Sequence, residues 1–118
     1  DGNTALMIAS LHGQCDTVCA LLSAAASVHP THHHDGSCAL MMACQQGDEV
    51  IVQHILNAQA NPDRIRTDGW TPLMVATHTG HVHVVDTLIT ANVNVNHDAN
   101  GRNALSIAAQ NGNHIMLA

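Results

Sequence analysis

Histidine is concentrated in one segment of this 118-residue chain, at positions His29, His32, His33 and His34. Neutral imidazoles bind transition metals, as does a deprotonated thiol, and Cys38 follows closely in the sequence. Alternate residues of an extended segment share a face, so His32 and His34 can converge on one ion while His33 cannot. The composition favours a solvated polar segment, and a metal- or pH-responsive segment is the alternative interpretation.

Two further cysteines, Cys15 and Cys19, are also candidates for metal chemistry. Residues four apart on a helix lie on the same face, so these two thiols can meet. The sequence has no Cys-x-x-Cys motif and no second pair at a zinc-like spacing, which favours two thiols that simply pack. His81 and His83 would point about 200° apart on a helix and cannot share an ion. We therefore expect no metal site.

Motifs of catalysis are missing from the sequence. It contains no Ser/His/Asp order of a hydrolase, no glycine-rich phosphate loop and no His-Glu-x-x-His motif. The adjacent acids Asp48 and Glu49 fit the first turn of a helix, where the helix dipole favours negative charge. We expect neither an enzyme nor a cofactor.

The charge balance argues against a nucleic-acid partner. Three Lys and Arg residues against nine Asp and Glu residues give a net charge of −6, whereas nucleic acid requires a basic surface. No apolar run approaches the roughly 20 residues that span a bilayer, and no signal sequence opens the chain. The four cysteines fall in an apolar helical pattern, which favours reduced thiols. We expect no membrane partner and an intracellular, cytoplasmic location.

The helices and turns that must position the candidate histidine and cysteine side chains are clearest in residues 68–96. A turn at 68–69 precedes Thr71 and Pro72, a helix N-cap and a residue suited to the first helical position. Gly80 ends that helix, and valines at three-and-four spacing predict a second apolar helix. The alternating residues 93–96 then predict an extended segment.

The same pattern recurs along the whole chain. A Leu-x-x-Ala-x-x-x-Gly skeleton occurs four times, and its glycines are 34, 33 and 32 residues apart. Copies in register at about 33 residues predict a repeat architecture. The copies are Leu6, Ala9, Gly13; Leu40, Ala43, Gly47; Leu73, Ala76, Gly80; and Leu105, Ala108, Gly112.

The turn, the Thr-Pro-Leu start, the spaced alanine and glycine, and the apolar second helix resemble an ankyrin repeat, over essentially the whole chain. The resemblance implies an all-α ankyrin-repeat solenoid of helix-turn-helix units with short hairpin fingers. We expect successive repeats at about 1–34, 35–67, 68–99 and 100–118. The last is truncated, so we expect neighbouring repeats in a longer parent chain.

Two sets of residues depart from the family pattern. The family's histidine after Thr-Pro-Leu, which bonds neighbouring loops, is replaced by methionine in three copies and by Ser106 in the fourth. The glycine expected after the second helix is replaced by Ala25, Gln59 and Asn92. Non-glycine residues there would carry a positive φ, at a cost of roughly 1 kcal/mol for alanine or glutamine.

The resemblance also implies a function: a non-catalytic protein–protein interaction module that holds another protein or peptide in a concave groove of fingers and first helices. A passive spacer within a longer array is the alternative. Trp70 is the only aromatic residue, and we expect it to face solvent and anchor the partner, flanked by Arg66, Arg102 and His78. Carrying the groove over by position adds Asn3, Ser37, Leu11, His12, Gln45, Gln46, Thr79, Gln110 and Asn111.

Overall fold

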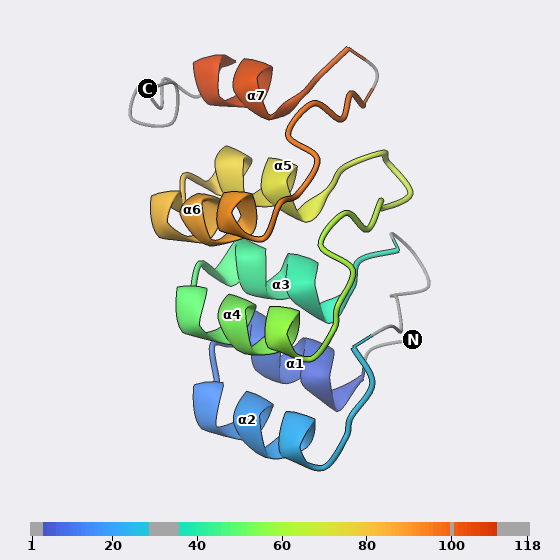
Figure 1. The fold of residues 1–118 in the computed structure, drawn as a ribbon, viewed down its shortest axis with the longest axis vertical. Helices are drawn as coiled ribbons and strands as arrows, with labels where there is room; N and C mark the ends of the chain where they lie inside the picture. Colours follow the sequence, from blue (N-terminus) through green and yellow to red (C-terminus); the bar gives the residue numbers. More distant parts are fainter. Residues whose placement is uncertain (1–3, 29–35, 100, 111–118) are drawn as a thin grey trace.

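The computed structural model describes residues 4–28, 36–99 and 101–110, and within these ranges the chain forms seven α-helices. Successive helix pairs stack in a single column, with α7 at one end (Figure 1). The principal extents are 39 × 26 × 22 Å. The helices are α1 (Ala5–Leu11), α2 (Cys15–Ser23), α3 (Ala39–Gln46), α4 (Glu49–Asn57), α5 (Pro72–Thr79), α6 (Val82–Thr90) and α7 (Ala104–Gln110).

The column has two layers of helices. In the first layer α1, α3, α5 and α7 pack side by side, and in the second layer α2, α4 and α6 do the same. Each first-layer helix of the three complete pairs also packs on the helix that follows it in the chain. This arrangement confirms the all-α architecture of helix pairs. None of the helices in the described ranges is both long enough and apolar enough to cross a membrane.

Side-chain caps begin three of the four first-layer helices, whereas Cys38 before α3 makes no such bond. Thr4 and Thr71 each accept a hydrogen bond from the amide three residues later, at 3.1 and 3.3 Å, and Pro72 opens α5. In the fourth copy, Asn103 replaces the threonine and exchanges two bonds with Ser106, each side chain accepting from the other's amide at 2.9 Å. This reciprocal pair satisfies two amides, one of which α7 would otherwise leave without a partner.

Left-handed residues follow the helices where the repeat pattern predicts them. Gly47 and Gly80 cap α3 and α5 with φ values of 90° and 79°. After the second helices, Ala25, Gln59 and Asn92 have φ values of 62°, 72° and 62°, which confirms the positive φ expected there. A side chain in this conformation crowds its own backbone, so Ala25 and Gln59 are strained by about 1 kcal/mol each.

The leucines of the repeated skeleton form the centre of the first layer. Leu6, Leu40 and Leu73 are 1%, 0% and 4% exposed, and the alanine three residues after each of them is 2% exposed or less. These small and branched side chains let neighbouring helices approach closely without any aromatic residue in the layer. The skeleton therefore holds successive pairs together.

Methionine follows the leucine in the first three copies. Met7, Met41 and Met74 are each 1% exposed. The flexible thioether fills the space between helices at the position where the resembled family has a histidine. Polar contacts between neighbouring repeats must therefore come from other residues.

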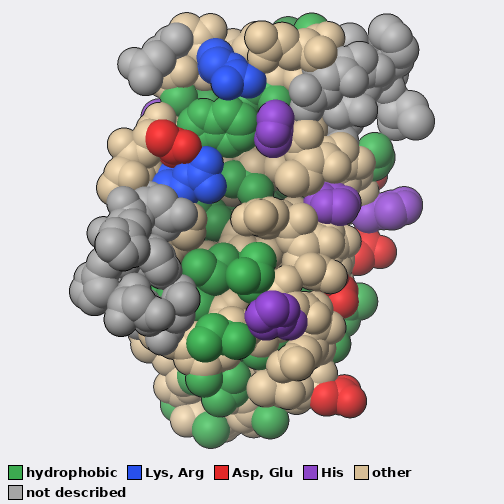
Figure 2. Space-filling view, turned by 180° about the vertical axis from the view of Figure 1, so that it is seen from behind, with side chains coloured by type: hydrophobic (Ala, Val, Ile, Leu, Met, Phe, Trp, Pro, Cys, Tyr) green, Lys and Arg blue, Asp and Glu red, His purple; other side chains and the backbone are tan. Residues whose placement is uncertain are grey.

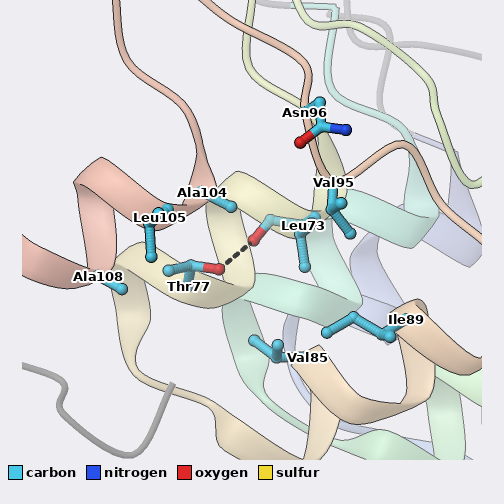
Figure 3. A pocket seen from close by; sticks show the side chains of 9 residues that line it. All are labelled: Leu73, Thr77, Val85, Ile89, Val95, Asn96, Ala104, Leu105 and Ala108. Atoms are coloured by element: carbon cyan, nitrogen blue, oxygen red, sulfur yellow. Dashed lines mark hydrogen bonds between the residues drawn. The ribbon is translucent and has the colours of Figure 1, made fainter. Parts of the chain in front are cut away.

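The fourth copy departs from this packing. Leu105 is 62% exposed and lies beside an apolar pocket between α5, α6 and α7, together with Leu73, Val85 and Ile89 (Figure 3). Elsewhere in the second layer each helix is covered by the next one. The pocket lies where the stack would place a further second-layer helix. The rest of the truncated fourth repeat, residues 111–118, lies outside the described residues.

The segment after α6 is not the extended segment expected at 93–96. Residues 95 and 96 form a turn, and Val95 is 45% exposed. The side-chain oxygen of Asn94 accepts the Asn96 amide at 3.0 Å, and this local bond competes with an extended backbone. The Asn94 amide in turn donates to the Asp63 carboxylate at 2.7 Å, which ties this segment to its neighbour in the preceding repeat.

Replacing Gln59 by glycine should stabilise the protein by about 1 kcal/mol, because glycine adopts the φ of 72° without steric cost. Gln59 is exposed, so little packing is lost. Chemical denaturation followed by circular dichroism measures the change. The matched control is Ala58→Gly, one residue earlier at a φ of −86°, which should destabilise. Equal effects of the two substitutions would contradict the strain at position 59.

Candidate functional site

Trp70 ends a tight turn that leads into α5. The Arg66 amide donates to the Trp70 carbonyl oxygen at 2.8 Å, and the Gly69 amide donates to the Arg66 carbonyl oxygen at 2.8 Å. Gly69 has a φ of 90°, and a Cβ added there would lie 3.1 Å from the Cβ of Ala99 in the next turn. Reciprocal backbone bonds between Ala99 and Arg102 form a second turn of this kind, so short hairpin turns are present as expected.

Asp68 organises this turn through its carboxylate. One oxygen accepts from Arg66 Nε at 3.0 Å and from the Trp70 amide at 3.0 Å, and the other accepts from Arg66 Nη2 at 2.8 Å. The hydrogen bond from Arg66, together with the Trp70 amide, lowers the pKa of Asp68 below its usual value. The Arg66 side chain is only 20% exposed, so the pair fixes the guanidinium group beside the indole.

Two arginines and a histidine surround the Trp70 ring. The guanidinium carbon of Arg102 lies 5.1 Å from the ring centroid and that of Arg66 lies 5.7 Å from it. The His78 ring stands edge-on to the indole, with centroids 5.4 Å apart and planes at 84°. Both cations are within the range at which the face of an indole attracts positive charge. The grouping of these four residues, which we call the Trp70 cluster, was predicted from the sequence.

The exposure of Trp70 was not predicted correctly. Its side chain is half-buried and packs against two hydrophobic clusters, one that runs through the first three repeats and a smaller one formed by Met74, Ala99 and Ile107. Trp70 is therefore less exposed than expected from the sequence. The turn at 66–70 folds the indole over the first layer, and only part of the ring is open to solvent.

Arg102 retains hydrogen-bonding capacity. Its Nη2 donates to Gln110 Oε1 at 2.8 Å, while its Nε is buried and has no hydrogen-bond partner. No ion pair of Arg102 occurs within the described ranges. A guanidinium group can donate five hydrogen bonds, so this side chain is suited to a carboxylate supplied from outside the chain.

The remaining predicted site residues fall into three groups. Ser37 is 5% exposed and cannot line a surface, so this prediction is wrong. The reason is that neighbouring turns pack closely: a Cβ added at Gly36 would lie 3.3 Å from the Thr67 amide nitrogen. Asn3 and Asn111, like the histidine-rich segment 29–34, lie outside the described residues. The exposed residues at the ends of the first-layer helices are Leu11, His12, Gln45, Gln46, Thr79 and Gln110.

One face of the column carries a mixed charged and apolar area. In Figure 2 basic side chains lie on either side of an apolar patch, with acidic and histidine side chains beside them. The interactions of Arg66, Asp68, Trp70, His78 and Arg102 account for such a combination of side chains. This face could therefore offer a partner both an aromatic surface and positive charge.

Sequence reasoning missed two histidines that join neighbouring repeats. His81 precedes α6, and its Nε2 also lies 3.1 Å from the Gln45 carbonyl oxygen. His97 Nε2 lies 2.9 Å from the Gly69 carbonyl oxygen. A carbonyl can only accept, so each ring nitrogen donates. The bonded residues are 36 and 28 positions apart in the sequence. Only the 33-residue repeat period could have predicted that they lie close together.

Two family models match the chain. The model described as Ankyrin repeats (3 copies) matches residues 40–117, and the model described as Ankyrin repeat matches residues 1–33. The two matches together cover nearly the whole sequence and agree with the stack of helix pairs.

Truncating Trp70 to alanine should lower the free energy of unfolding by about 2–3 kcal/mol, somewhat less than for a fully buried tryptophan. The cause is the loss of packing against both hydrophobic clusters. Urea denaturation measures the change. Ile65→Ala, at a nearby side chain that is 54% exposed, should cost less than about 0.5 kcal/mol. An unchanged midpoint for Trp70→Ala would show that the indole does not support the fold.

Proposed function

Since the chain belongs to the ankyrin repeat family, we propose that it presents a concave surface of fingers and first-layer helices to a partner protein or peptide. Ankyrin repeats are generally protein–protein interaction modules, and the family is typically non-catalytic. We assign the repeats to about 1–34, 35–67, 68–99 and 100–118. The N-caps Thr4, Cys38 and Thr71 of the first three support this spacing.

The Trp70 cluster is the observation that carries this proposal. Aromatic residues and arginine dominate the binding energy of protein interfaces, and here an indole lies between two guanidinium groups. Asp68 already pairs with Arg66, which leaves Arg102 as the cation best placed to meet a new partner. The guanidinium group donates to Gln110 in the described part of the chain and retains further N–H donors for a carboxylate.

The charges favour a short acidic segment as the partner. A carboxylate can take two parallel hydrogen bonds from a guanidinium group, which gives orientation as well as energy. The chain as a whole carries a net charge of −6, so an acidic partner is repelled everywhere except near the few arginines. The binding segment therefore combines one or two acids with an apolar side chain for the indole. The exposed ends of the first-layer helices, Leu11, His12, Gln45, Gln46, Thr79 and Gln110, form the rest of the groove in this proposal.

Peptides selected from a displayed library should bind with an affinity that depends on Arg102. Arg102→Gln should weaken binding about 10-fold or more, because a charged hydrogen bond is lost. Trp70 is the only tryptophan, so its fluorescence reports binding at the proposed site without a label. Added salt should weaken the same complex, since part of the attraction is between exposed charges.

The chain offers a matched control in its third arginine. Arg64 contributes positive charge near the Cys38 thiol and, in the described part of the chain, makes no ring contact with Trp70, so Arg64→Gln should change the affinity by less than about 2-fold. Equal losses for both substitutions would mean that only net charge matters. A library that yields no binder dependent on Arg102 would favour the passive spacer.

A further inference from the structure

Three potential metal ligands from two repeats meet on the second layer. Cys15 and Cys19 lie one turn apart on α2, and His54 lies on the neighbouring helix α4. One ligand atom from each, the two Sγ atoms and a ring nitrogen, all lie within 4.8 Å of one another. All three side chains are partly buried. The sequence alone did not predict this grouping, because His54 is 35 positions from Cys19 along the chain.

The cluster is open to solvent from one side. Cys19 and His54 line a shared surface depression between α2 and α4, together with Leu22, Asn57 and Ala58. An ion can therefore reach the Cys19 thiol and the imidazole without opening the core, and Cys15 lines a second surface depression beside Asp16. The apolar neighbours lower the local polarity, which strengthens the attraction between a cation and thiolates.

We propose that Cys15, Cys19 and His54 bind a Zn²⁺ ion that joins the first repeat to the second. Two sulfurs and one imidazole nitrogen are a ligand set that zinc prefers, and a water would complete a tetrahedron. Tetrahedral zinc with metal–ligand distances of about 2.0–2.3 Å brings its ligand atoms to roughly 3.5–4 Å from one another. From separations of up to 4.8 Å this needs a contraction of at most about 1.3 Å, within reach of small side-chain rotations.

The charges around the cluster favour a cation. Partial desolvation raises the pKa of the Cys15 thiol, and the adjacent Cys19 and the acids Asp48 and Asp16 raise it further. The negative groups around the cluster attract a divalent ion. A bound ion then favours the thiolate form of both cysteines over the thiol form. Binding Zn²⁺ must therefore release about two protons from the thiols, and the ligand imidazole of His54 must be neutral.

A metal at this position would strengthen one interface of the stack. Each repeat in a solenoid contacts only its neighbours, so a link between α2 and α4 stabilises the first repeat through the second. Zinc binds the folded arrangement of ligands and not the separated one, so it raises the melting temperature, and the stabilisation grows with the logarithm of the ratio of free zinc to the dissociation constant.

Titration with Zn²⁺ tests the proposal. The intact chain is first changed to the triple variant His32→Asn, His33→Asn, His34→Asn, so that the histidine-rich segment cannot contribute a competing site. In reductant, calorimetry should show one equivalent of Zn²⁺ with a micromolar or lower Kd and release of about two protons. Co²⁺ in place of Zn²⁺ should give the charge-transfer absorbance of thiolate ligation.

Substitutions within the cluster decide whether all three residues bind. On the same background, Cys19→Ser and His54→Gln should each weaken Zn²⁺ binding at least 10-fold and remove the rise in melting temperature. His83→Gln, an exposed histidine on α6, and Cys44→Ala, a buried cysteine on α3, should leave the affinity within about 2-fold. Circular dichroism without metal shows whether each variant folds.

Three results would overturn the proposal. The first is a background variant that binds no Zn²⁺, which would assign any binding to the histidine-rich segment. The second is an affinity that His54→Gln leaves unchanged, which would reduce the site to a pair of thiols on one helix. The third is a Co²⁺ complex without sulfur charge transfer, which would place the metal on other ligands.

Discussion

The contact between successive helix pairs is the interaction on which the rest of the structure depends. The helices are seven to nine residues long, shorter than the roughly 12–15 residues at which an isolated helix becomes marginally stable in water. They persist because Leu6, Leu40 and Leu73, with their companion alanines, bury themselves against the next pair. The stack then positions the turns, the caps and the Trp70 cluster. Each repeat in it depends on contact with a neighbouring repeat for its stability.

Polar groups join the same neighbours at the edges of the stack. His81 reaches the Gln45 carbonyl oxygen, His97 reaches the Gly69 carbonyl oxygen, and Asp63 accepts the Asn94 amide. With methionine buried where the family places its loop-bonding histidine, these bonds connect adjacent repeats through other residues. The hydrophobic contact determines which faces of neighbouring repeats meet. Hydrogen bonds of this kind require a particular geometry and so also orient the two repeats.

Local chemistry and the repeat period could be read from the sequence. Thr71 with Pro72, Gly80 and the positive φ at Gln59 each follow from a residue type and a position within one repeat. The all-α stack was implied by the resemblance to ankyrin repeats, and the period added that four copies in register bury equivalent faces. The same register also grouped Trp70 with Arg66, Arg102 and His78.

What the sequence did not reveal depends on contacts between repeats. Ser37 is buried because one turn lies against another, and Trp70 is half-buried because its ring spans two clusters. The turn at Val95 and Asn96 depends on a side-chain bond that competes with an extended backbone. Cys15 and Cys19 were visible as a pair, yet their third neighbour, His54, comes from the next repeat.

The buried row of Met7, Met41 and Met74 has a consequence for chemical ageing. Oxidation turns a thioether into a polar sulfoxide, which the apolar space between these helices cannot accommodate without loss of packing. Because each of the three sulfur-bearing side chains is 1% exposed, a peroxide can react only while a repeat is transiently open. Each such event would prevent the opened repeat from closing again, so oxidants would convert brief local opening into lasting damage that only a reductase reverses.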